Sequence, residues 1–170
     1  MEENKSSIKY VGKVTITLKE RQMVTYNNGT SKLFNILNSF ISKNNVLSGD
    51  MPTYIMLYQV DYTKLLETPS TDEFNSFRIL NTYPLLNGST VTNTSMDESV
   101  VFTSDIDSDY LKTAVSNSDL DIISIAIVSA DTKSILAAAS IADGKTLVEH
   151  LRSGKSVMVK WQMSFDNYSY

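Results

Sequence analysis

The sequence predicts a mainly β protein: an antiparallel β-sandwich of about eight or nine strands with one amphipathic α-helix near residues 30–43. Three observations support this fold class. Segments of alternating apolar and polar residues recur along the chain, with turn residues between them. Only one segment spaces its apolar residues as a helix does. Ser, Thr and Asn are abundant, and these residues suit turns and exposed strand faces better than helix interiors.

No linker, repeat or change of composition divides the 170 residues, so we expect a single domain over residues 9–165. A chain of this length can bury a core without disulfides, and the sequence contains no cysteine. Residues 1–8 and 166–170 lack periodicity, and we expect them to be flexible arms.

The formal net charge is −4, and no basic stripe is present. Because neutralisation of phosphates dominates nucleic-acid affinity, we expect no nucleic-acid partner. The N-terminal segment is polar, and no apolar run approaches the ~18 residues that span a bilayer. We therefore expect neither a membrane partner nor an export signal.

The first predicted elements are two strands joined by a tight turn. The first strand alternates over residues 13–18 and has one apolar face, formed by Val14, Ile16 and Leu18. The pattern breaks at Glu20-Arg21 and resumes over residues 23–26, which predicts a returning strand.

The period then changes to that of a helix. Thr30 or Ser31 can cap its N-terminus, and Asn44-Asn45 can end it. Because the helix is short and amphipathic, we expect it to lie against the sheet. Its apolar stripe is formed by Leu33, Phe34, Leu37, Phe40 and Ile41.

The middle of the chain carries weaker signals. "PTYIMLYQV", after Pro52, predicts a continuous apolar strand. Residues 61–88 are expected to be irregular, with Pro69 and Pro84 as breakers and a turn at Asn87-Gly88. "TVTNT" and "ESVVFTS" predict exposed, Thr-rich strands, and "DSDYLKTAVSNSDL" predicts a surface loop.

The C-terminal third carries the clearest strands. "DLDIISIAIVSADTKSILAAASIA" predicts a hairpin whose first strand is apolar on both faces, so it should be central and covered on both sides. "SVMVKWQMSF" alternates regularly. The inward face of this last strand is expected to carry Val157, Val159, Trp161, Met163 and Phe165. Trp161 is therefore interpreted as a core residue and not as a platform for a sugar.

Two tripeptides, GKT at 144–146 and GKS at 154–156, resemble the end of a phosphate-binding loop. The full loop also needs a glycine five residues before the GK glycine, and Ala139 and Glu149 stand there instead. We interpret Gly144 and Gly154 as turn glycines between strands, and we expect no nucleotide cofactor.

Other candidate sites are weak, and we expect no catalytic residues. Asp105, Asp107 and Asp109 have the spacing of the first half of a calcium loop, but the glycine and the glutamate that such a loop needs next are absent. His150 is the only histidine, and because there are no cysteines to complete a ligand set we expect no zinc site. We place it on a surface strand, with Glu149 pointing to the opposite face.

The segment "SILAAASIADGKTLVEHLRSGKSVMVKWQMSF" resembles the C-terminal part of small structural proteins of tailed bacteriophages, including crAss-like gut phages. In these tail, collar or neck, and fibre-attachment proteins, a strand "S-I-L-A-x-A-S" precedes a closing strand "G-x-S/T-φ-x-φ-x-W-x-M-x-F". The segments "NNGTSKLFNIL" and "PTYIMLY" are similar in layout. The resemblance implies a virion component, carries no catalytic residues over, and leaves residues 61–118 unmatched.

We therefore expect a non-enzymatic virion protein that forms a symmetric oligomer with copies of itself and with other virion proteins, in the tail, neck or fibre base. Phe165, Tyr168 and Tyr170 are the candidate interface residues, because aromatic side chains are enriched in interface cores. One alternative is a carbohydrate-binding sandwich for host attachment, which needs an exposed aromatic platform or calcium near Asp105–Asp109. A glycan-cleaving enzyme is a further alternative and needs two carboxylates across a cleft.

Overall fold

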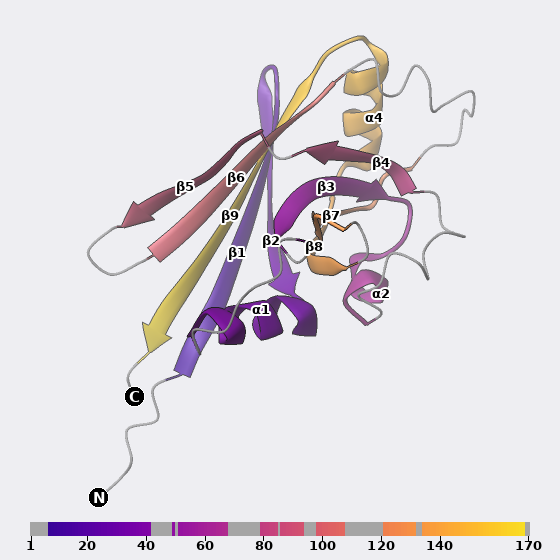
Figure 1. Cartoon of the computed structure of the whole chain (residues 1–170). Helices are drawn as coiled ribbons and strands as arrows, with labels where there is room; N and C mark the ends of the chain where they lie inside the picture. The colour runs from indigo at the N-terminus through magenta and orange to yellow at the C-terminus, as the bar shows by residue number, and fades with distance from the viewer. Residues whose placement is uncertain are drawn as a thin grey trace, which may run out of the picture.

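The computed structural model describes residues 7–41, 49, 51–67, 79–84, 86–93, 98–107, 121–131 and 134–168. Within them the chain has nine strands and three helices (Figure 1). The strands are β1 (Ser7–Leu18), β2 (Arg21–Gly29), β3 (Pro52–Tyr58), β4 (Ile79–Pro84), β5 (Leu86–Asn93), β6 (Glu98–Ile106), β7 (Ser124–Ser129), β8 (Ile135–Ser140) and β9 (Val157–Tyr168). The helices are α1 (Ser31–Ile41), α2 (Tyr62–Glu67) and α4 (Gly144–Arg152).

All nine strands belong to one antiparallel sheet, in the order β4-β3-β7-β8-β2-β1-β9-β6-β5. The sheet bends at β2, which pairs with β1 over Arg21–Asn27 and with β8 only at Asn28 and Gly29. A second corner lies between β4 and β5, because only residue 85 separates them while β4 pairs with β3 and β5 pairs with β6. The two halves are thus joined through β2 and again through the connection from β4 to β5, and the sheet is nearly closed.

We call β2-β1-β9-β6-β5 the first half-sheet and β4-β3-β7-β8-β2 the second half-sheet. The prediction of a mainly antiparallel β fold is confirmed. The prediction of a sandwich of two separate sheets is wrong, because the two halves are joined at β2 and the fold is barrel-like. Alternation shows which face of a strand is buried, but it does not show which strand lies beside it, so the corner at β2 has no signal of its own.

The second corner also changes the interpretation of Asn87-Gly88. These residues, predicted as a turn, lie inside β5, where the register against β6 shifts between Leu86 and Ser89. A bulge bends a strand and increases its twist, and glycine is common at such positions. The turn signal therefore marks a bulge just after the corner.

The main core lies between the two half-sheets and follows the predicted alternation. Val14, Ile16 and Leu18 of β1 are buried as predicted. So are Val157, Val159, Trp161 and Met163 of the predicted inward face of β9, while the side chain of the fifth, Phe165, lies outside the described part of the structure. They pack in one cluster with residues of the second half-sheet, including Ile55, Leu57, Ile125 and Ile127.

The prediction that the Ile-rich strand is central and covered on both sides is confirmed. It is β7, which lies between β3 and β8, and all six of its residues are buried. Ile125 and Ile127 face the main core. Ala126 and Val128 face a second cluster on the other side, beneath α2, to which Tyr58 and Leu65 also belong.

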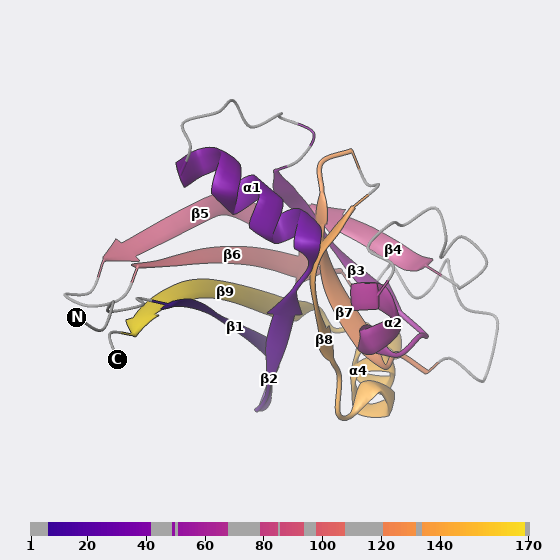
Figure 2. The same cartoon turned by 90° about the horizontal axis from the view of Figure 1, so that it is seen from below.

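Helix α1 confirms the predicted helix at 30–43. The amide of Leu33 donates to Thr30 Oγ1 at 3.4 Å, and the Thr30 hydroxyl donates to the carbonyl of Ile135 at 2.7 Å. Leu33 and Ile36 are buried, whereas Phe34 is half exposed and meets Tyr10 of β1 edge to face at 6.2 Å. Figure 2 shows α1 running from the end of β2 across the inner side of the bent sheet. The predicted stop at Asn44-Asn45 lies outside the described residues.

Two helices and one strand were not predicted. Residues 61–88, expected to be irregular, contain α2 and β4, and the segment after β8, expected to be turns and strand, contains α4. An aspartate precedes each unpredicted helix: the Thr63 amide donates to Asp61 Oδ1 at 2.9 Å, and the Thr146 amide donates to Asp143 Oδ1 at 3.1 Å. Both helices are short, so their caps carry more of the signal than their periodicity does.

The ends of the chain meet in the first half-sheet. Ser7 pairs with Tyr168 and Lys9 pairs with Asp166, so the β1–β9 ladder extends into both segments that the sequence predicts as arms. Figure 1 shows the start of β1 and the end of β9 next to each other at the same end of the sheet. None of the described helices is long and apolar enough to cross a membrane.

Candidate functional site

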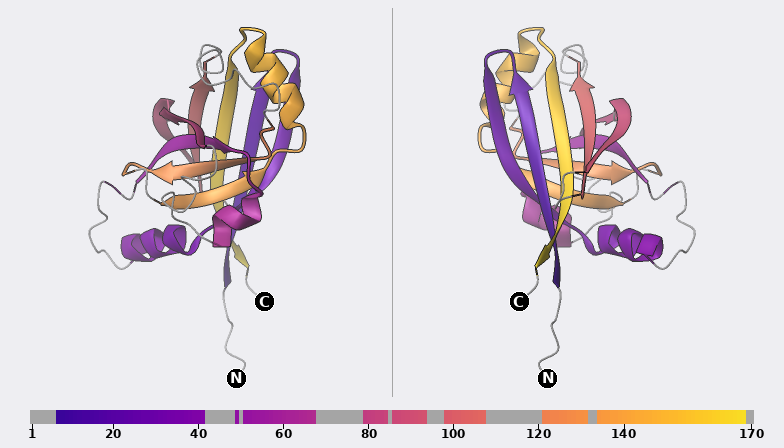
Figure 3. Two further views of the ribbon diagram at one scale, coloured as in Figure 1. Left: turned by 90° about the vertical axis from the view of Figure 1, so that its right-hand side faces the viewer. Right: turned by 90° about the vertical axis from the view of Figure 1, so that its left-hand side faces the viewer.

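One face of the first half-sheet has none of the described helices over it (Figure 3). Thr15 pairs with Val24 of β2 on one side and with Lys160 of β9 on the other. In the same way Lys13 pairs with Tyr26 and Gln162, and Thr17 pairs with Gln22 and Met158. None of these residues is buried. We call this set the outer face: Lys13, Thr15, Thr17, Gln22, Val24, Tyr26, Met158, Lys160 and Gln162. None of the three described helices lies over it (Figure 3).

Three apolar side chains stand on the outer face. Tyr26 is 69% exposed, Val24 51% and Met158 45%. Single exposed apolar residues are common on proteins and need no explanation. These three lie on two strands that flank β1, so they frame a polar centre formed by threonine and lysine. Aromatic and Met side chains with polar neighbours are the composition of a protein contact surface.

The charge on the outer face has one sign. Its charged members are Lys13 and Lys160, which lie on the adjacent strands β1 and β9, while the whole chain is acidic at −4. On the neighbouring strand β6, however, Asp105 is exposed opposite Met158, so the wider surface carries both signs and charge alone does not select a partner.

Behind the outer face, three side chains form a buried polar cluster. The Tyr10 hydroxyl donates to Asn27 Oδ1 at 2.5 Å, and the Trp161 indole hydrogen-bonds with Tyr10. Burial raises the pKa of Tyr10 well above its ordinary value, and the hydrogen bond with Trp161 opposes this only in part. The phenol is therefore neutral and serves as a hydrogen-bond donor. The cluster ties β1, β2 and β9 together next to the corner at β2.

Gly12 makes room for this cluster. A Cβ built at Gly12 would lie 2.1 Å from Asn27 Oδ1, so any other residue at position 12 would displace the amide. Gly12 and Asn27 are paired across β1 and β2, one residue before β2 changes its partner. The glycine thus belongs to the corner and not to a ligand site.

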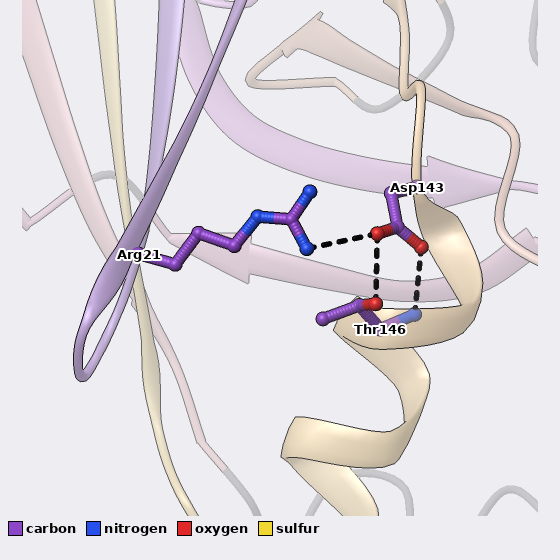
Figure 4. Close-up of polar contacts among 3 residues, drawn as sticks. All are labelled: Arg21, Asp143 and Thr146. Carbon is purple, nitrogen blue, oxygen red and sulfur yellow. Dashed lines mark hydrogen bonds and ion pairs between the residues drawn. The ribbon is translucent and has the colours of Figure 1, made fainter.

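The first phosphate-loop tripeptide is not the predicted turn, because Gly144 opens α4. The helix N-terminus is already occupied by a carboxylate: Asp143 accepts from the Thr146 amide and, at 2.8 Å, from the Thr146 hydroxyl (Figure 4). Arg21 of β2 adds an ion pair with Asp143 at 3.0 Å. These contacts, with those of Thr146 first, lower the pKa of Asp143. An anionic side chain thus holds the position that a bound phosphate would take.

The need for glycine at 144 comes from packing. A Cβ at this position would lie 1.6 Å from the carbonyl oxygen of Ile122, so α4 approaches the chain before β7 too closely for any side chain. Gly154, in contrast, has a φ of 84° and is a turn glycine as predicted, but its turn joins α4 to β9 and not two strands.

His150 and Glu149 lie on α4, so their placement on a surface strand is wrong. His150 Nε2 is 3.3 Å from the carbonyl oxygen of Ser156, and Glu149 is exposed. The buried positions Leu147, Val148 and Leu151 have helical spacing, which is the signal that could have identified α4 from the sequence.

The structure places two of the three predicted cation ligands. Asp105 is exposed near the end of β6, opposite Met158, and Asp107 is exposed directly after this strand. Asp109 lies outside the described residues. No group of three or more His, Cys, Asp or Glu side chains in the described part of the chain could hold a metal ion.

Two of the three predicted interface residues, Phe165 and Tyr168, lie at the end of β9. The backbone of Phe165 pairs with Tyr10 of β1 and with Glu98 of β6, and that of Tyr168 pairs with Ser7. Tyr170 lies outside the described residues. Contact of these three residues with another subunit stays a prediction.

A comparison of the chain with protein-family models finds no match, and comparisons with curated proteins and with solved structures find none either.

Proposed function

We propose that this chain is a non-enzymatic structural protein of a tailed-bacteriophage virion, which assembles as a symmetric oligomer in the tail, neck or fibre base. The observation that carries the proposal is the outer face, a sheet surface without a covering helix that exposes Tyr26, Val24 and Met158. The sequence resemblance to small phage structural proteins supports the choice of particle. The hydrogen bonds of Tyr10 with Asn27 and Trp161 tie three strands together, which is a structural role.

The size of the outer face limits what it can hold alone. Three strands about 4.8 Å apart, each over about five residues at about 3.4 Å per residue, cover roughly 250 Å². A stable protein contact buries about 800 Å² per partner. An oligomer built on the outer face therefore needs further contact from the neighbouring strands β6 and β5, or from another virion protein.

The test is the mass of the full-length protein in solution. We expect size-exclusion chromatography with light scattering to give a closed oligomer, and the double variant Tyr26→Thr/Met158→Thr to shift it toward the monomer. Glu149→Ser, an exposed change on α4, is the control and should leave the mass unchanged. A wild-type protein that is monomeric at every concentration tested contradicts the proposal.

The choice of particle needs its own test. We expect a portal, major capsid or tail gene beside the gene of this protein, and the protein itself in purified particles by mass spectrometry. Its absence from purified particles would remove the virion part of the proposal and leave the assembly part to the mass measurement.

One observation favours a carbohydrate-binding alternative. Tyr26 presents a largely exposed ring, and in its row lie the hydrogen-bonding side chains of Lys13 and Gln162. Flat aromatic rings with polar neighbours can stack on a sugar. A glycan array followed by titration would support this function if binding is lost in Tyr26→Thr and kept in Val24→Thr. Equal binding by both variants would exclude the outer face as a glycan site.

A further inference from the structure

We propose that the free edge of β5 pairs antiparallel with β5 of a second copy across a two-fold axis, so that the first half-sheets of two copies join into one sheet. The inference rests on the proposed assembly function and names the partner and the contact.

The edge is open in the structure. β5 is the last strand in the sheet order, it pairs with β6 on one side, and no described strand pairs with its other side (Figure 1). The bulge lies at its start, between Leu86 and Ser89, and the ladder with β6 is regular over Ser89–Asn93. Five regular residues are about the length of an ordinary strand, and alternate ones direct their backbone groups away from β6.

The charge of β5 fits a partner that is its own copy. Across a two-fold axis only the residue on the axis lies opposite its own copy, and the others pair with residues of the same short segment, so charges of one sign on the edge would be brought close together. The eight residues of β5, "LNGSTVTN", contain no charged residue and no proline. Proteins commonly protect an open edge with lysine, proline or an inward charge, and over Ser89–Asn93 none of these is present.

The other end of the sheet differs. β4 is six residues long and ends in Pro84, which has no amide hydrogen to donate. Pairing at that end would also start at the corner between β4 and β5. Of the two terminal strands, β5 is the one that offers an uninterrupted set of donors and acceptors.

The β5–β5 pairing also supplies the additional contact that an oligomer built on the outer face requires. β5 belongs to the same half-sheet as β1, β2 and β9, so a β5–β5 contact places two outer faces on one continuous sheet. The enlarged surface is then open to a third copy or to a different virion protein. The uncharged edge and the exposed Tyr26 thus have separate roles in one assembly.

The direct test is a cysteine scan, which is free of background because the chain has no cysteine. Single variants Ser89→Cys, Thr90→Cys, Val91→Cys, Thr92→Cys and Asn93→Cys are oxidised mildly and run on non-reducing gels. Residues directly opposite in an antiparallel pair have Cα atoms about 4.5 or 5.5 Å apart, which a disulfide can bridge. We expect one position, on or beside the two-fold axis, to form a disulfide-linked dimer at least about tenfold faster than the control Glu149→Cys, which is exposed on α4 away from both proposed contacts.

A pair of proline variants tests the hydrogen bonds themselves. Thr90→Pro and Val91→Pro are neighbours, so one removes an amide that donates to β6 and the other removes an amide that points out from the edge. Whichever variant removes the amide that donates to β6 should lower the thermal midpoint of unfolding. The variant that removes the outward-pointing amide should change the thermal midpoint by no more than a few degrees. It should raise the dimer Kd roughly tenfold or more, because a symmetric dimer loses the hydrogen bond between subunits twice.

The outcomes separate the two proposals. If light scattering gives an oligomer but no β5 cysteine crosslinks faster than the control, the edge inference is overturned and the assembly function stands. If the wild type is a monomer throughout, both are overturned. If the two proline variants change assembly only in step with unfolding, β5 pairs within the subunit alone and the inference is likewise overturned.

Discussion

β7 and β9 are both inner strands of their half-sheets, yet they differ in what covers them. β7 has packed side chains on both faces, the main core on one and the cluster beneath α2 on the other. β9 buries one face and leaves Met158 and Lys160 on the outer face. The sequences differ accordingly, since β7 is continuous as "SIAIVS" whereas β9 alternates as "VMVKWQM".

The difference separates stability from recognition within one sheet. In the second half-sheet, β7 gains burial from two sides, so its residues are committed to holding the fold. The first half-sheet needs only its inner row for the core, and its outer row is free to change for a partner. Variants on the two faces of β9 should therefore behave as two different classes, and those on the two faces of β7 as one.

Trp161→Ala should give the largest loss of stability, about 3–5 kcal/mol, because the ring is fully buried and its removal leaves a cavity. The measurement is urea denaturation of the purified variant. Trp161→Phe is the matched control: it keeps an aromatic ring, loses the hydrogen bond with Tyr10, and should cost clearly less. An unchanged midpoint for Trp161→Ala would mean that the inner row of β9 is not part of the core.

Val128→Ala should cost about 2 kcal/mol, although Val128 points away from the main core, because it is fully buried in the cluster beneath α2. The equivalent second face of β9 carries Lys160, and Lys160→Ala should change stability by no more than about 0.5 kcal/mol. The comparison fails if the two variants lose similar amounts of stability in the same denaturation experiment.

Strands with strong alternation could be predicted from the sequence, and so could the face that each one buries. β1, β7, β8 and β9 were predicted because their side chains follow the two-residue period over at least five residues or are apolar throughout. Trp161 was correctly placed in the core by the same period. These are local properties of the sequence, so they can be predicted without knowing which strands pair.

What could not be predicted depends on non-local contacts. That β2 leaves β1 for β8 at Asn28-Gly29 depends on a pairing between segments more than a hundred residues apart. The need for glycine at 144 arises from the carbonyl of Ile122, which sequence spacing cannot bring near it. α4 is an intermediate case. Its capping aspartate and the helical spacing of its apolar residues are present in the sequence, but the tripeptide "GKT" favoured a turn.

Gly144→Ala should destabilise the protein by about 1–3 kcal/mol, since the new Cβ would overlap a backbone oxygen that cannot move alone. Gly154 gives a matched contrast. There the requirement is a positive φ with open space around the Cβ, so Gly154→Asn should be tolerated while Gly144→Asn is not. Equal losses at the two positions, measured as thermal midpoints, would contradict this assignment of packing to one glycine and conformation to the other.

Asp143→Ala should cause a smaller, pH-dependent loss. The pKa of Asp143 is lowered in the folded protein, chiefly by the hydrogen bonds from Thr146. Its contribution is therefore fully present above the ordinary pKa of about 3.9 and is lost as the pH falls through the lower folded value. The difference in stability between wild type and variant should be constant from pH 7 to pH 5 and shrink below pH 4.

Asp61→Ala is the control for this prediction, because Asp61 caps α2 through Thr63 in the same way and its pKa is also lowered. Asp143 differs in having Arg21 as an ion-pair partner. Added salt should therefore reduce the effect of Asp143→Ala slightly more than that of Asp61→Ala, since exposed ion pairs are screened. A loss that grows as the pH falls would reverse the sign and exclude the capping role.

Tyr26→Thr should have the smallest effect on stability of all, within about 0.5 kcal/mol, because the ring is 69% exposed and threonine keeps the preference for a strand. Its effect should appear in assembly instead, measured as the oligomer mass at fixed protein concentration. The combination is what distinguishes the outer face from the core: a residue that packs inside changes the midpoint, and a residue that binds a partner changes only the mass. A fall in the denaturation midpoint as large as that of Val128→Ala would place the Tyr26 ring in an intramolecular contact, and the first half-sheet would then have no free face.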